Sequence, residues 1–256
     1  MKTYFILLKK DLLELWRNKR FLIIAVVFIV FALGSPIMAR MMPEIITSID
    51  FGSSSESVKI ELPPATITDS YDQFVSNITQ MGVFAIIATF GGLIVRERRK
   101  GLYNNLVNNG VNKIQFLFAK VDAQCIAVTV IYLVSCLLFS AYNYILFDAF
   151  LVEHSLLSFL SLYVYLIFII CLVNFFATIA KSTTLSIVLS FAVAILIGLF
   201  EFFKFGKYLP NHLVNISFDV FRDPEYLDYA YTTIGIGLLI SLILAGLSVQ
   251  LLKNKE

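Results

Sequence analysis

Side chains that could do catalytic chemistry are few in this sequence. The two histidines, His154 and His212, each stand alone, so neither an HExxH zinc site nor a histidine-based triad can be assembled. Residues 180–183, Ala-Lys-Ser-Thr, end like a phosphate-binding loop, but that motif needs glycine where Phe175 and Ala180 stand. We therefore expect this chain to be no enzyme, with no catalytic residue, no metal site and no bound cofactor.

The composition indicates a membrane protein instead. Of the 256 residues, 59% are hydrophobic and 15% are charged, and the mean hydropathy is +0.83. A soluble domain is usually about 45–50% apolar, and so few charges could not cover this much apolar surface in water. The net charge of +2 lacks the strong positive field that nucleic-acid binding requires. The three cysteines, Cys125, Cys136 and Cys171, lie in apolar runs and are expected to be buried, unpaired thiols.

Six stretches lack Asp, Glu, Lys, Arg and His for 19 to 26 residues each. A helix needs roughly 20 residues to cross about 30 Å of hydrocarbon, and a charge at the bilayer centre costs at least about 2.5 kcal/mol. We predict an all-α polytopic membrane protein that forms a single transmembrane domain over residues 1–256. Its six membrane helices are expected at about 21–40, 73–95, 117–147, 155–180, 182–203 and 229–252.

The charges predict the orientation. Of the 20 Lys and Arg residues, 15 lie before the first span, between the second and third, at Lys181 and after the last. The positive-inside rule then places both termini in the cytoplasm and the connections 41–72 and 204–228 outside. Val58–Glu61 could form a short strand in the first of these connections. The aromatic residues of the second favour an interfacial belt, with a segment that dips into the membrane as the alternative.

Residues 1–20 have the pattern of an amphipathic helix. Phe5, Leu8, Leu12 and Leu15 recur at helical spacing, with Trp16 beside them and basic residues on other faces. Such a helix lies in the headgroup layer of a membrane, whereas the plainer alternative is a cytoplasmic extension.

The basic connection 96–116 is predicted to form a helix, a sharp turn and the start of the third span. Arg96, Arg98, Arg99 and Lys100 precede an apolar-spaced helix that ends at residues 108–110, Asn-Asn-Gly. Asn112 then caps the next helix. The compact shape suits docking to another protein, but a tight turn whose basic rim anchors lipid would give the same pattern.

Three stretches of the chain together resemble the membrane subunit of an ABC-2 type permease, an ABC transporter family of exporters. They are LLELWRNKR at residues 12–20, SPIMARMMPEI at residues 35–45 and ERRKG at residues 97–101. The resemblance implies that residues 1–20 form an elbow helix and that residues 97–112 act as the coupling element that seats in a groove of the ATPase. Its candidate contact residues are Glu97, Arg98, Arg99, Lys100, Gly101, Leu102, Asn105, Leu106, Asn109 and Gly110.

The same resemblance implies the partners. They are two ATP-binding cassette ATPase subunits, which carry the ATP and magnesium, a second copy of this chain or a related permease, and the lipids of a bacterial cell membrane. ATP-driven rocking would move the substrate outward. This agrees with the six charge-free stretches, which Asp122 and Glu201 only border and which hold no charged residue for ion coupling. Phe84, Phe90 and Asn174 could face a pathway at the dimer interface.

The substrate and two rival functions stay open at this stage. Spans rich in Phe and aliphatic residues favour an amphipathic or hydrophobic substrate, such as a peptide or a lipid-like molecule. One rival is a stand-alone channel or secondary carrier, for which Asn77, Asn143 and Asn174 would line the path. The other is a non-transporting membrane scaffold or immunity protein whose 96–116 segment docks a signalling partner.

Overall fold

The structure is a computed structural model that describes residues 2–48, 64–200, 206–222 and 225–253. These residues form helices and turns with no β-strand, and six of the helical stretches are long and apolar enough to cross a membrane. The predictions of an all-α polytopic protein and of six spans are confirmed. The spanning stretches are Arg20–Ile46, Ile67–Arg99, Lys113–Phe147, Ser155–Ile179, Thr183–Phe200 and Tyr229–Leu252. The proposed strand at residues 58–61 lies outside the described residues.

The helices follow one another with short connections. In chain order they are α1 (Lys2–Arg17), α2 (Arg20–Ser48), α3 (Ile67–Asn77), the π-helix η1 (Ile78–Gly82), α4 (Val83–Phe90), α5 (Leu93–Arg99), α6 (Leu102–Asn108), α7 (Lys113–Phe147), α8 (Ser155–Ile179), α9 (Thr183–Phe200), the 3-10 turn η2 (Gly206–Tyr208), α10 (His212–Asp219) and α11 (Glu225–Lys253).

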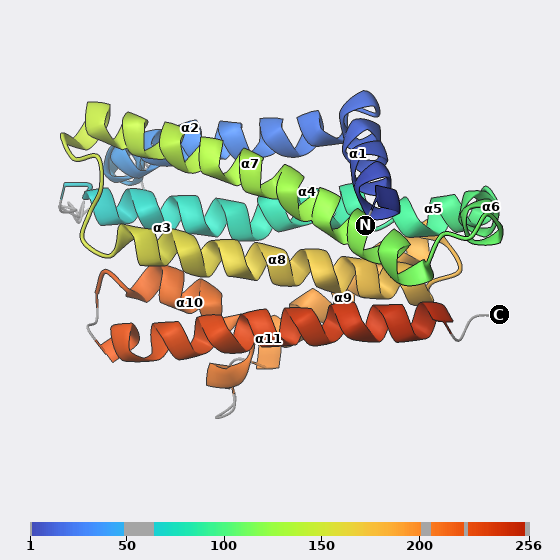
Figure 1. Ribbon diagram of the computed structural model, residues 1–256. Coiled ribbons are helices and arrows are strands. Elements are labelled where there is room, and N and C mark those ends of the chain that lie inside the picture. The colour runs from blue at the N-terminus through green and yellow to red at the C-terminus, as the bar shows by residue number, and fades with distance from the viewer. Residues whose placement is uncertain (1, 49–63, 201–205, 223–224, 254–256) are drawn as a thin grey trace, which may run out of the picture.

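The long helices run side by side, and α1 lies crosswise at one end of the bundle (Figure 1). The same end holds α5, α6 and the last turns of α11, and we call it the α1 end; the opposite end, which holds α10, is the α10 end. The helix α8 and the α3–α4 stretch form the centre, since 72% of the most apolar window of each is buried. Only 11% of that window is buried in α9, which leaves α9 at the periphery.

The second span is interrupted twice. It changes to a π-helix at Ile78–Gly82 and breaks again at Gly91 and Gly92 before α5. A Cβ on Gly91 would stand 2.7 Å from the side chain of Ile187, and one on Gly92 would stand 2.4 Å from that of Thr183. Glycine therefore lets the break lie directly against the start of α9.

Two predicted segments differ from the structure. The second span extends past residues 73–95 at both ends, because Thr66 caps α3 and α5 continues through its basic residues to Arg99. The connection 204–228 contains α10, which packs against α8 and α11 with Leu213 and Ile216 fully buried. This connection is therefore more than the expected interfacial belt of aromatic residues, because α10 folds back against the bundle.

Candidate functional site

Four charged side chains join three helices at the α1 end. The Nζ atom of Lys120 on α7 lies 3.0 Å from Asp11 of α1 and 3.1 Å from Glu97 of α5. The Nζ atom of Lys10 lies 2.7 Å from Glu97 and 3.2 Å from Asp11. The exposed fractions of Asp11, Glu97 and Lys120 are 3%, 4% and 2%. We call these four residues the buried ion cluster.

The charges of the buried ion cluster balance, which is what makes their burial tolerable. Burial alone would lower the pKa of Lys10, but its hydrogen bond to Glu97 and the charges of Asp11 and Glu97 outweigh that effect and raise it. Asp11, Glu14 and Glu97 present carboxylate oxygens within 4.8 Å of one another, the spacing of a cation site. The ammonium groups of Lys10 and Lys120 already neutralise two of these carboxylates, so the geometry is that of an ion-paired joint.

A second contact fastens α1 to α7. The hydroxyl of Tyr4 donates a hydrogen bond to the carboxylate of Asp122, which raises the pKa of Tyr4 to about 12. Together with the buried ion cluster, this contact holds α1 against the bundle at two points along its length.

Arg98 anchors α5 to the end of α8. Its Nη1 donates to the carbonyl oxygen of Thr178 and its Nη2 to that of Ala180, both at 2.5 Å. These carbonyls belong to the last turn of α8 and its C-cap, where backbone acceptors lack helical partners and the helix dipole favours a cation. Residues 97 and 98 thus tie α5 to α1, α7 and α8 at once.

Beyond this anchor, α6 projects as a short exposed helix. Gly101 and Gly110 flank it with φ of +72° and +81°, the left-handed conformation that suits glycine. On its inner side, the ring of Tyr103 packs edge-on to that of Phe116 on α7, with ring centroids 5.2 Å apart. The side chain of Asn112 accepts a hydrogen bond from the backbone N–H of Ile114 and caps α7, as the sequence predicted.

The residues predicted to meet an ATPase divide into three groups by exposure and contacts. Glu97 is buried and Arg98 is half-buried, and both bind partners within this chain. Gly101 and Leu106 are partly exposed. The other six are exposed: Arg99, Lys100, Leu102, Asn105, Asn109 and Gly110.

The predicted apolar stripe of α1 also divides. Phe5 and Trp16 are 63% and 68% exposed, whereas Leu15 is 3% exposed and packs into the protein core. Leu8 and Leu12 are partly buried. The face that α1 buries centres on Asp11, because the ammonium group of Lys120 on α7 lies against the carboxylate of Asp11. The sequence analysis did not identify Asp11 and Lys120 as site residues. The available signal was an acid in the amphipathic helix 1–20, Asp11, and a lysine near the start of the third span, Lys120.

The three predicted pathway residues do not share a surface. Phe84 is 56% exposed and lies beside Phe191 of α9, with ring centroids 5.0 Å apart. Phe90 and Asn174 are each 1% exposed, so neither side chain faces outward to a second subunit in this conformation. Asn174 lies on the central helix α8, where its amide exchanges hydrogen bonds with Gln124 of α7 at 2.7 and 3.3 Å.

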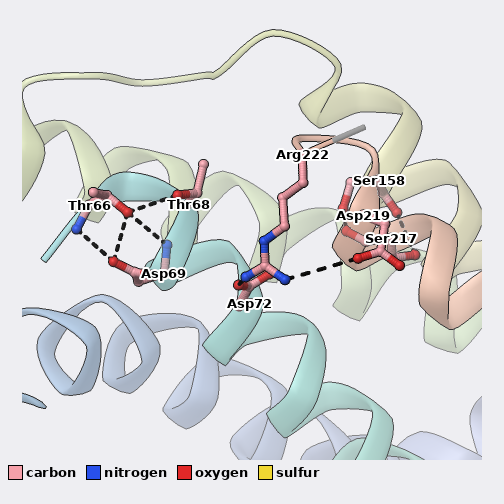
Figure 2. A network of polar contacts seen from close by, with 8 residues as sticks. All are labelled: Thr66, Thr68, Asp69, Asp72, Ser158, Ser217, Asp219 and Arg222. Carbon is pink, nitrogen blue, oxygen red and sulfur yellow. Dashed lines mark hydrogen bonds and ion pairs between the residues drawn. The ribbon is translucent and has the colours of Figure 1, made fainter. Parts of the chain in front are cut away.

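Polar contacts also fix the α10 end (Figure 2). Thr66 and Asp69 form a capping box at the start of α3. One turn later, Asp72 pairs with Arg222, which follows α10 (Figure 2). Ser217 of α10 and Ser158 of α8 exchange hydroxyl-to-carbonyl hydrogen bonds at 2.7 and 3.2 Å. The short helix α10 is therefore fastened to both central helices.

The fold and the α1 end define a multi-pass helical membrane protein with a short exposed helix anchored to its spans. The family model described as ABC-2 family transporter protein matches residues 33–221, which include the second to fifth spans, α6 and α10. The chain belongs to this family of ABC transporter membrane subunits, which are not themselves the ATPase. A comparison with curated proteins gives no match.

Proposed function

We propose that this chain is the permease subunit of an ATP-driven exporter of a bacterial cell membrane and that α6 is its coupling helix. In this proposal the α1 end faces the cytoplasm, where two ATPase subunits hold ATP and magnesium. A second copy of the chain, or a related permease, completes the membrane domain. The amphipathic or hydrophobic substrate moves outward between the two subunits.

One observation carries the proposal: α6 is exposed, while α5, directly before it, is bound to three other helices through adjacent residues. Glu97 links α5 to α1 and α7, and Arg98 links it to α8. A push on α6 would therefore reach α1 and the third and fourth spans without crossing a flexible loop. Coupling by rigid-body motion requires such a stiff connection.

The breaks in the second span add a place for that motion. The backbone hydrogen-bond ladder is interrupted at Gly91 and Gly92, between α4 and α5. Helix motion concentrates where a helix is kinked or broken, since fewer hydrogen bonds resist bending there. In our mechanism α5 and α6 tilt about this break when the ATPases close, and the buried ion cluster passes the displacement to α1 and α7.

The test is to purify the tagged chain from its native cell in mild detergent and to quantify associated ATP-binding subunits together with ATPase activity. Leu102→Asp and Asn105→Asp place an acid on the exposed side of α6, and Lys181→Asp is the matched control at the exposed turn before α9. We expect the two α6 variants to lose the ATPase and the control to retain it.

Other results would support the rivals. Purification of the chain without any ATPase, together with ion flux in vesicles, would favour a stand-alone channel or secondary carrier. A bound partner whose association never responds to ATP would favour a scaffold or immunity protein. Equal ATPase recovery from the wild type and from both α6 variants would exclude α6 as the docking element.

A further inference from the structure

A basic cavity of about 330 Å³ opens at the α1 end between α1, the start of α2 and the α5–α6 segment. Its wall includes three cationic side chains, Arg20, Arg96 and Lys100. Glu14 of α1 also faces it, and Leu93 and Leu102 supply apolar surface.

The charges around the cavity do not balance. Glu97 also lines it, but the ammonium groups of Lys10 and Lys120 neutralise that carboxylate within the buried ion cluster. Within the described part of the chain, no carboxylate forms an ion pair with Arg20, Arg96 or Lys100. Three cations therefore face the single remaining carboxylate of Glu14.

Arg20 makes the imbalance costly. It is only 9% exposed, and its hydrogen bond runs from Nη1 to the backbone oxygen of Thr89 at 3.4 Å, a long contact. A buried guanidinium carries five N–H donors and is stabilised by an anion that accepts several of them. The cavity beside Arg20 is where such an anion fits.

The position of the cavity beside α1 indicates the type of anion. The helix α1 exposes Phe5, Ile6, Leu13 and Trp16, and aromatic and aliphatic side chains of this kind lie at the boundary of headgroups and acyl chains. Glu14, on the same helix, forms part of the cavity wall. With α1 at the membrane surface, the cations would lie at the level of lipid phosphates, and the neighbouring leucines would suit the glycerol and first methylenes of a lipid.

We propose that this cavity binds the headgroup of an anionic phospholipid of the phosphatidylglycerol class. The phosphate accepts hydrogen bonds from Arg20 and Arg96 and pairs with Lys100, while the headgroup hydroxyls reach Glu14. Basic pockets between membrane helices bind anionic headgroups in this way. The proposal rests on α1 lying at the membrane surface, not on transport. A bound lipid would join α1 to α5 beside the buried ion cluster.

The test measures lipid binding to the purified full-length chain in neutral detergent. Dioleoyl phosphatidylglycerol and dioleoyl phosphatidylcholine are titrated separately, and bound lipid is counted by native mass spectrometry with the unfolding temperature as a second readout. We expect tight binding and a raised unfolding temperature with phosphatidylglycerol only. Arg96→Gln and Lys100→Gln should each weaken binding on the order of fivefold, the effect of about 1 kcal/mol per cation.

Lys9→Gln and Arg99→Gln remove exposed cations that do not line the cavity and serve as controls. Arg20→Gln is kept out of the main comparison, because a buried side chain could affect folding. Equal binding of the two lipids, or equal loss in the controls, would overturn the proposal. Inorganic phosphate that competes as well as the lipid would identify a soluble-anion site and overturn the lipid assignment. ATPase recovery is measured separately, so failure of either proposal is visible alone.

Discussion

Lys120 of α7 and Glu97 of α5 form an ion pair of 3.1 Å, and the two residues are 2% and 4% exposed. The pair stands at the base of α6 and shares Asp11 and Lys10 of α1. The pair joins α5, which directly precedes the exposed helix α6, to the third span α7. A push on α6 would be transmitted to α7 through this contact.

Lys120→Met is expected to destabilise the protein by about 3–5 kcal/mol, because it leaves the carboxylates of Glu97 and Asp11 buried with one ammonium between them. The double variant Glu97→Gln with Lys120→Met should recover much of this loss, since the one remaining ammonium, of Lys10, then neutralises the one remaining carboxylate, of Asp11. Thermal unfolding in detergent measures both, with exposed Lys9→Met as the control. A double variant no more stable than the single one would show that charge balance is not the cause.

Gly91→Ala and Gly92→Ala should each destabilise the packing of the second span against α9 by about 1–3 kcal/mol, the usual range for overpacking. Their Cβ atoms would approach Ile187 and Thr183 to 2.7 and 2.4 Å. Gly246→Ala is the matched control, because a Cβ at that helical position meets nothing within 4 Å. The measurement is the unfolding temperature, and a similar fall for all three variants would argue against the close approach.

Arg98→Lys should behave almost like Arg98→Ala. Lysine keeps the charge but cannot present two parallel N–H donors to Thr178 and Ala180, so we expect a loss of about 1.5–3 kcal/mol, typical of charge-assisted hydrogen bonds. Amide hydrogen exchange around residues 179–185 should speed up in both variants and stay unchanged in Arg99→Lys, which alters an exposed residue. Full rescue by lysine would mean that charge alone holds the end of α8.

The contact of Tyr4 with Asp122 predicts a pH-dependent stability. The folded protein raises the pKa of Tyr4 to about 12, above the usual value near 10, so it holds the phenol proton more tightly than the unfolded chain does. The stabilisation is then complete below pH of about 10 and is lost as the pH rises to about 12. The free energy of unfolding of the wild type should exceed that of Tyr4→Phe at pH 8, and the two values should converge near pH 12. A difference in unfolding free energy that stays constant from pH 8 to pH 12 would contradict the stabilising role of the Tyr4–Asp122 hydrogen bond.

Several features could be predicted because they depend on neighbouring residues alone. Charge-free runs of about span length predict membrane helices wherever they occur, since lipid leaves the backbone no other partners. The exposed turn around Gly110 and the cap at Asn112 follow from residue types within a few positions of each other. The second span shows the limit of this reasoning, because its breaks at Ile78–Gly82 and Gly91 depend on how closely neighbouring helices approach.

The sequence by itself determined the fold class, the six spans and the position of the exposed helix α6, because hydrophobic length and turn chemistry are local. Only the tertiary structure decided which charges meet. Lys120 and Asp11 are 109 positions apart and Tyr4 and Asp122 are 118 apart, so no spacing in the chain predicts either contact. The crossing of α1 over α7 brings them together and buries Glu97, because charges removed from water are stable only beside their opposites.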